Sequence, residues 1–114
     1  ARRGPAGYTW PMVRVTAFYA HDDQARFDWD YYVNQHLPLV RNLLGEHLLG
    51  LQAQRGLQGL AAGMPPLYTA MAHMDFASME AMNGALLPHV ATITADIAHY
   101  TSIPLQVQIS EILD

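Results

Sequence analysis

Tyr32 and His36, two side chains that can orient and transfer protons, lie four residues apart. They fall in a stretch whose apolar residues recur at spacings of three and four, so on a helix both point toward the buried face. A neutral imidazole is the side chain best placed to move protons near pH 7. We therefore predict that His36 is a general acid or base, and that Tyr32 or Tyr31 orients a substrate oxygen by a hydrogen bond. A histidine that only packs in the core is the alternative.

A carboxylate that could serve this histidine, Asp96, comes near the end of the second apolar-periodic stretch. A negative charge near a helix C-terminus is unfavourable, so we expect Asp96 to make a compensating bond, either structural or to a substrate. If Asp96 pairs with His36, it fixes the imidazole tautomer and completes an acid–base arrangement. His89, just after Pro88 in the same stretch, is a second candidate near this cleft.

Composition excludes several kinds of chemistry. The sequence contains no Cys and no Lys, which removes thiolate, Schiff-base and P-loop lysine chemistry. No histidine pair has HxH or HxxxH spacing and no Gly-rich loop has phosphate-binding form, so we predict no metal and no cofactor. A formal net charge of −4 argues against a nucleic-acid partner. No apolar run approaches the roughly 18 to 20 residues that span a bilayer, so we expect no membrane partner and a cytoplasmic location.

Four segments alternate apolar and polar residues as strands do, and two carry the apolar stripe of a helix. Their order, β, α, β, β, α, β, favours an α+β, ferredoxin-like fold, in which both helices cover one face of a four-stranded antiparallel sheet. Pro38 and Pro88 should bend or split the helices. The predicted strands are 12–20, 48–55, 67–76 and 105–112, and the predicted helices are 29–44 and 79–97.

The length of 114 residues suits one domain with its own core. We place this domain at residues 12–114, because the strand pattern opens at Met12, and we treat 1–11 as an extension or an added segment. Methionines along the predicted strands and helices, Met74 among them, offer an adaptable lining for an apolar ligand, although methionines at such spacing usually belong to the core.

The second face of the predicted sheet is polar but almost without carboxylates, and it has no lysine. A solvent-facing antiparallel sheet usually carries charges of both signs. Glutamines and hydroxyls instead fit a face that is covered by another sheet, so we predict a homodimer through the sheet faces. An ordinary solvated face is the alternative. The residues on this face are Arg14, Thr16, Gln52, Gln54, Thr69, His73, Gln106, Gln108 and Ser110.

The stretch ARFDWDYYVNQHLPLV, with MAHMDFASMEAM, LLPHV and ADIAHYTSIPLQVQISEI further along, resembles the EthD family of the dimeric α/β-barrel superfamily. The resemblance extends over 12–113 and implies a small homodimer. Neighbouring families with similar barrels include cofactor-free monooxygenases, an isomerase and haem binders, so the resemblance leaves the reaction open. Its most characteristic residues are Phe27, Asp28, Tyr31, Tyr32, His36 and Pro38, followed by Ala95 to Ile97 and Tyr100.

Three functions stay open on these grounds. The first is a cofactor-independent enzyme of oxygenase, isomerase or cyclase type, which acts on an apolar or aromatic carbonyl compound by proton transfer. The second is a non-catalytic binding or accessory protein for a hydrophobic small molecule, and the third is a haem-binding barrel. The predicted catalytic residues are His36, Tyr32 and Asp96, and the predicted substrate-binding residues are Tyr31, His89, Tyr100, Phe27 and Met74.

Overall fold

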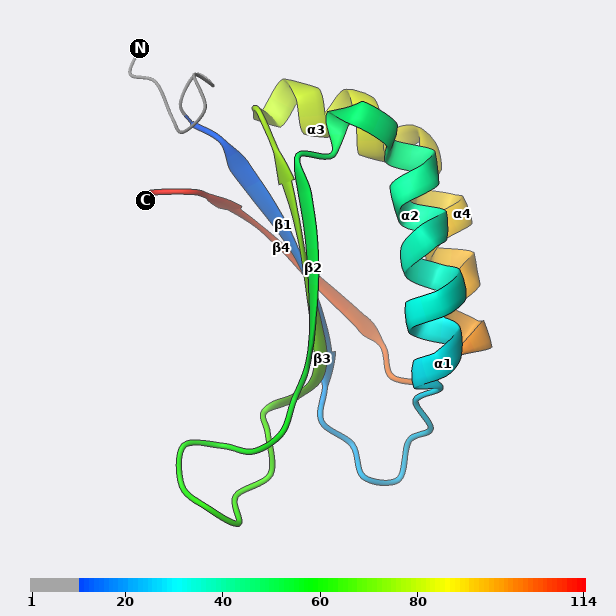
Figure 1. The fold of residues 1–114 in the computed structure, drawn as a ribbon, viewed down its shortest axis with the longest axis vertical. Coiled ribbons are helices and arrows are strands. Elements are labelled where there is room, and N and C mark those ends of the chain that lie inside the picture. Colours follow the sequence, from blue (N-terminus) through cyan, green and yellow to red (C-terminus); the bar gives the residue numbers. More distant parts are fainter. Residues whose placement is uncertain (1–10) are drawn as a thin grey trace.

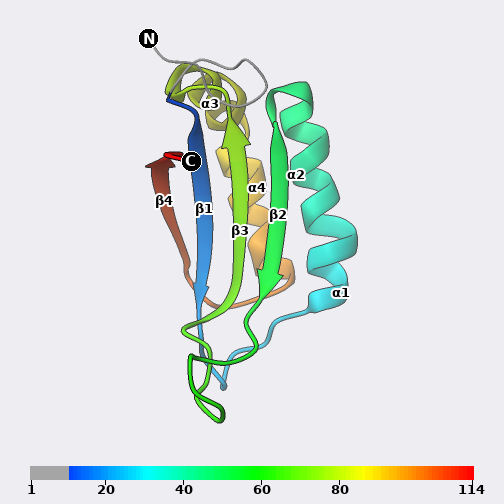
Figure 2. The same cartoon turned by 60° about the vertical axis from the view of Figure 1, so that its left-hand side comes forward.

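The computed structural model describes residues 11–114, so the expected extension lies outside the described residues except for Pro11. Four strands form one sheet in the order β2-β3-β1-β4, and every neighbouring pair is antiparallel (Figure 2). The predicted α+β fold with a four-stranded antiparallel sheet is confirmed. The strands are β1 (Val13–Ala20), β2 (Gly50–Arg55), β3 (Tyr68–Phe76) and β4 (Leu105–Glu111).

The first helical segment is interrupted beside its proline, as expected. Asp28 caps α1 (Trp29–Tyr31) by accepting the Tyr31 N–H, and α2 (Leu37–Leu44) ends at Gly45, whose φ of 60° suits glycine. Between them, Tyr32–His36 form a π-helical turn, in which the Leu37 N–H reaches back to the Tyr32 carbonyl. Single π-turns of this kind often occur at functional sites.

The second helical segment is split in the same way. Ser78 caps α3 (Met79–Leu86), a 3₁₀ turn at Leu87–His89 contains Pro88, and α4 (Val90–Asp96) follows. Pro88 has no N–H to donate to a continuing α-helix, so the backbone hydrogen bonds change from the α-helical to the 3₁₀ pattern at this point. None of the helices in the described chain combines the length and the apolar character needed to cross a membrane.

Both helical segments lie on one face of the sheet, and no helix of residues 11–114 covers the other face (Figure 1). The alternation in β1 explains this, because its helix-facing residues are buried and apolar. The core has an aliphatic part and an aromatic part. The aliphatic part is Val13, Val15, Val40, Leu44, Phe76 and Met82. The aromatic part is Tyr19, Tyr32, Leu37, Ala70, Ile97, Tyr100 and Ile103.

The uncovered face carries the polar residues expected from the sequence, in register across the four strands. Thr16 pairs with His73 on one side and with Gln108 on the other, and the Thr16 Oγ1 and His73 Nδ1 atoms are 3.0 Å apart. Arg14 donates two hydrogen bonds to the Asp75 carboxylate, at 2.7 and 2.9 Å. The charges on this face are therefore satisfied within the chain, which leaves a nearly neutral surface.

Candidate functional site

A cavity of about 280 Å³ lies between the helices and the sheet. Most of its wall is aliphatic, and none of the residues that line it is Asp, Glu, Lys or Arg. Tyr32 and His36 face it from the π-turn, Tyr19 from β1 and Met74 from β3. A concave, mainly apolar site with a few polar groups is typical of small-molecule binding.

The π-turn brings Tyr32 and His36 to this wall together. Their side chains are almost fully buried, as predicted, and their rings stack with centroids 5.8 Å apart and planes 14° apart. The Tyr100 ring packs against the His36 ring at 4.7 Å. The imidazole is therefore held in one orientation between two aromatic rings.

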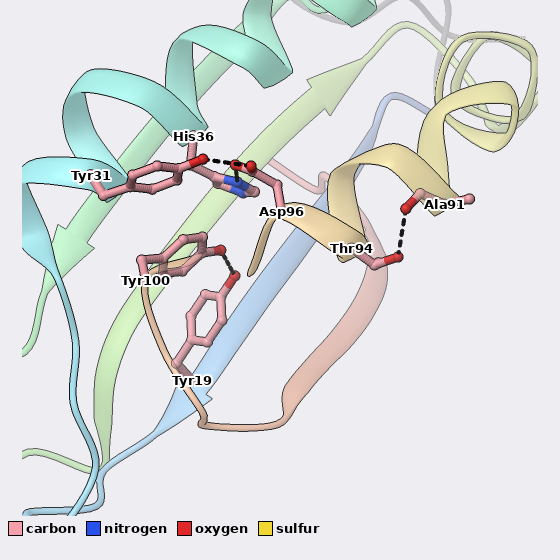
Figure 3. A network of polar contacts seen from close by, with 7 residues as sticks. All are labelled: Tyr19, Tyr31, His36, Ala91, Thr94, Asp96 and Tyr100. Carbon is pink, nitrogen blue, oxygen red and sulfur yellow. Dashed lines mark hydrogen bonds and ion pairs between the residues drawn. The ribbon is translucent and has the colours of Figure 1, made fainter. Parts of the chain in front are cut away.

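His36 is paired with Asp96, sixty positions further along the chain. His36 Nδ1 lies 2.9 Å from Asp96 Oδ2, and the Tyr31 hydroxyl donates to Asp96 Oδ1 at 2.7 Å (Figure 3). An ionised carboxylate only accepts hydrogen bonds, so the neutral imidazole carries its proton on Nδ1 and leaves the Nε2 lone pair free. Nε2 has no hydrogen-bond partner among residues 11–114. The pairing of Asp96 with His36, which the sequence offered as one option for this carboxylate, is thus present.

Burial and hydrogen bonding set the charges of this pair. Burial lowers the pKa of His36 below its ordinary 6.5, against the opposing effect of the hydrogen bond and charge of Asp96. Burial alone would raise the pKa of Asp96, but the hydrogen bonds from Tyr31 and His36 outweigh it and the pKa is lowered. At neutral pH the site therefore holds a neutral imidazole beside a carboxylate.

The lowered pKa of His36 predicts a loss of stability in mild acid. Below pH 6.5 the unfolded chain binds a proton at this position more readily than the folded protein does, so the free energy of unfolding falls until the pH passes the folded pKa. Replacing His36 by Gln removes this contribution. Urea denaturation at pH 7 and pH 5 should show a smaller acid loss in the His36→Gln variant than in the wild type. An equal loss in both would contradict the assignment.

The Tyr32 hydroxyl has no hydrogen-bond partner in the part of the chain that the structure describes, although Tyr32 is only 2% exposed. It is the one such buried side-chain atom among the described residues. Burial, and next the nearby Tyr19, raise the pKa of Tyr32, so its hydroxyl stays protonated and can donate. The neighbouring Tyr19 hydroxyl is already bonded to that of Tyr100 at 2.5 Å (Figure 3).

The predicted substrate-binding residues are only partly brought together. Met74 lines the cavity, but Phe27, Tyr31, His89 and Tyr100 do not. Tyr31 supports Asp96 from behind, Tyr100 and Phe27 pack against Tyr32, and His89 lies half-buried in the 3₁₀ turn. Tyr31, Tyr100 and Phe27 therefore contact the cavity only through other side chains, and His89 lies outside the lining.

Some residues at the cavity were not predicted from the sequence as site residues. Tyr19 was assigned only to a strand, yet it lines the cavity and anchors Tyr100. Leu87, Val90, Val107 and Ile109 line the cavity while staying 38 to 63% exposed, so they form its mouth between the second helical segment and β4. Within the described chain, no three His, Asp or Glu side chains converge as metal ligands would.

A ferredoxin-like α+β domain with an apolar cavity under its helices is the class that this fold and site define. The family model of the EthD domain matches residues 22–104, and the chain belongs to the EthD family. No curated protein matches the sequence. An EthD-like protein from Ralstonia eutropha JMP134 is 38% identical, with 91% of this chain and 94% of that one covered and a TM-score of 0.85.

More distant structures share the fold. An EthD family protein from Bacillus halodurans C-125 is 20% identical, with coverage of 90% and 99% and a TM-score of 0.69. A dimeric ferredoxin-like protein of unknown function from Thermobifida fusca is 16% identical, with coverage of 98% and 100% and a TM-score of 0.59.

Two enzymes also share the fold. The hydroxynitrile lyase of Passiflora edulis is 16% identical, with coverage of 91% and 95% and a TM-score of 0.63. A cofactor-independent oxygenase from Streptomyces nogalater is 11% identical, with coverage of 90% and 93% and a TM-score of 0.54. At these identities the likeness concerns the fold alone.

Proposed function

We propose that this EthD-family protein is a cofactor-independent enzyme that acts on an apolar or aromatic carbonyl compound by proton transfer through His36. The observation that carries the proposal is the pairing of His36 Nδ1 with Asp96, which leaves Nε2 free on a residue of the cavity wall. A histidine that only filled the core would have its second nitrogen bonded to the protein.

The reaction step follows from these positions. Nε2 takes a proton from the carbon next to the carbonyl group, and the electron pair of that C–H bond moves to form an enolate. The Tyr32 hydroxyl donates a hydrogen bond to the developing oxyanion. The Asp96 carboxylate stabilises the imidazolium that results, until the proton returns to the same or another carbon. That the fold also serves a lyase and a cofactor-independent oxygenase is compatible with this chemistry.

Hydrogen–deuterium exchange at carbon tests this step before the natural substrate is known. We expect the protein to accelerate exchange of the protons next to the carbonyl group of acetophenone and phenylacetone in D₂O, measured by ¹H NMR. Binding of these ketones without any exchange would overturn the enzyme proposal and favour the alternative of a binding protein, which the largely apolar cavity wall also suits.

The third alternative, a haem-binding barrel, also requires a histidine on the cavity wall, as His36 is. Adding hemin to the purified protein and recording the visible spectrum tests it. A shifted Soret band that is lost on replacing His36 would favour haem binding over proton transfer. An unchanged hemin spectrum would remove this alternative.

We further propose that the protein forms a homodimer through the uncovered face of its sheet. Phe18 and Met71 pair across the two central strands of this face, and the Phe18 ring packs on Tyr68 at 5.0 Å. The surrounding glutamines are exposed and the Arg14–Asp75 pair is internally satisfied, so a second sheet can cover the face without burying an unpaired charge. The dimeric ferredoxin-like protein of Thermobifida fusca supports such an assembly.

A charge on a central strand of this face should separate the protomers. We expect Phe18→Arg to raise the dimer dissociation constant by about 30-fold or more, the effect of losing a central interface residue. Light scattering after gel filtration at micromolar concentration measures the mass. Asn42→Arg on the exposed side of α2 is the matched control and should stay dimeric. A wild type that is monomeric at this concentration would refute the dimer.

A further inference from the structure

The unpartnered hydroxyl of Tyr32 identifies which ligand chemistry the cavity is built to accept. A buried hydroxyl without a partner destabilises the protein, because water would have bonded it in the unfolded chain. The other hydroxyls on the cavity wall are satisfied internally. Tyr19 bonds Tyr100, and Thr94 Oγ1 donates to the Val90 carbonyl at 2.8 Å. Tyr32 lines the cavity and its hydroxyl has no partner among residues 11–114, so it is the donor left for an acceptor that enters beside it.

The charges around the cavity exclude an anionic ligand. Within residues 11–114 no Arg or Lys lines it, and the charge behind the imidazole is the Asp96 carboxylate. The lowered pKa of His36 keeps its ring neutral at pH 7, so the ring supplies no compensating charge. A carboxylate that entered would lose its hydration without gaining an opposite charge.

The shape of the cavity determines how a bound ligand is oriented. Tyr32 and His36 are almost fully buried at one part of the wall, whereas Leu87, Val107 and Ile109 are between 46 and 63% exposed at the mouth. The mouth is mainly aliphatic, although Asn83 and Thr94 also line the cavity from exposed positions. A polar end that reaches Tyr32 therefore leaves an apolar remainder to contact the mouth, where its burial is favourable.

We propose that the cavity selects an uncharged molecule with one buried acceptor oxygen, bound to Tyr32, and an apolar tail that leaves between α4 and β4. A ketone or aldehyde fits this description, and a carboxylic acid does not. The inference rests on the site of the proposed function but requires binding only, so it stands or falls separately from catalysis.

Three probes of similar size separate the effects of an acceptor oxygen, an apolar body and a negative charge on binding. They are acetophenone, ethylbenzene and benzoate. By ligand-observed NMR titration, the wild type should bind acetophenone roughly fivefold to tenfold more tightly than ethylbenzene, the gain from one hydrogen bond. Benzoate should bind more weakly than both. Tyr32→Phe should remove the preference for acetophenone and leave ethylbenzene binding unchanged. Tyr68→Phe on the opposite face is the matched control and should keep the preference.

Tyr32→Phe should also stabilise the free protein. Replacing a tyrosine whose hydroxyl is bonded within the protein would not do so. Removal of the unpartnered hydroxyl is expected to raise Tm by about 2 to 6 °C. A lower Tm together with an unchanged preference for acetophenone would overturn the assignment, because the hydroxyl would then have a partner in the free protein.

A substitution at the mouth tests the direction of the tail. Val107→Trp should weaken hexanophenone, whose longer chain must pass the mouth, at least tenfold more than it weakens acetophenone. Equal effects on both ketones would overturn the proposed exit. If acetophenone binds as expected but its protons do not exchange, the proposed function fails and this inference stands. If exchange occurs while benzoate binds as well as acetophenone, the inference fails and the function stands.

Discussion

Replacing His36 by Gln is expected to lower the rate of carbon-bound deuterium exchange in ketones by about 10²- to 10⁴-fold, the usual contribution of a positioned general base. Glutamine is close to histidine in size and its amide N–H can still donate a hydrogen bond to Asp96, so the cavity should keep its shape. What it lacks is a nitrogen with a lone pair that takes up a proton near pH 7. The ¹H NMR exchange assay at pH 7.5 measures the rate.

A matched control for this variant is His47→Gln, at an exposed position in the turn that follows α2. It should exchange ketones at the wild-type rate. Acetophenone should bind to His36→Gln with an affinity within about threefold of the wild type, because the ligand oxygen is held by Tyr32. Exchange that persists at the wild-type rate in His36→Gln would assign the proton transfer elsewhere.

The fold was predictable because each strand and helix carries its own local signal. In β1 the buried Val13, Val15 and Tyr19 alternate with residues of the open face, and this period of two fixes which side faces the helices. Pro38 and Pro88 marked the breaks in the helices. The kind of break was not predictable, since a missing N–H is compatible with a bend, a 3₁₀ turn or a π-turn.

Only the part of the site formed by residues close in the sequence was predictable. Tyr32 and His36 are four residues apart on one stripe, so their common direction follows from helix geometry. Tyr31 lies one position earlier and points instead toward Asp96, which made it a support for the carboxylate and not a substrate contact. The mouth depends on how far the second helical segment covers the edge strand β4, and this is a long-range property without a sequence pattern.

The pairing of His36 with Asp96 gives the second large expected effect. In an Asp96→Asn variant the amide can present either its oxygen or its nitrogen to His36 Nδ1, and the nitrogen would force the imidazole proton onto Nε2, where it blocks the base. The amide also brings no negative charge to stabilise the imidazolium. Because the hydrogen bond and charge of Asp96 raise the pKa of His36 against burial, their loss lowers this pKa further and weakens the base.

We therefore expect Asp96→Asn to slow ketone exchange by about 10²-fold or more while acetophenone affinity changes little. Long-range ¹H–¹⁵N NMR spectra of the His36 ring report which nitrogen is protonated, and the signal of the Nδ1–H tautomer should weaken. Asp30→Asn, whose exposed carboxylate accepts a hydrogen bond from Asn34, is the matched control and should leave rate and tautomer unchanged. If Asp96→Asn keeps the rate although the tautomer shifts, His36 is not the base. If both stay unchanged, the carboxylate does not control the imidazole, and the Tyr31 hydrogen bond has only a structural role.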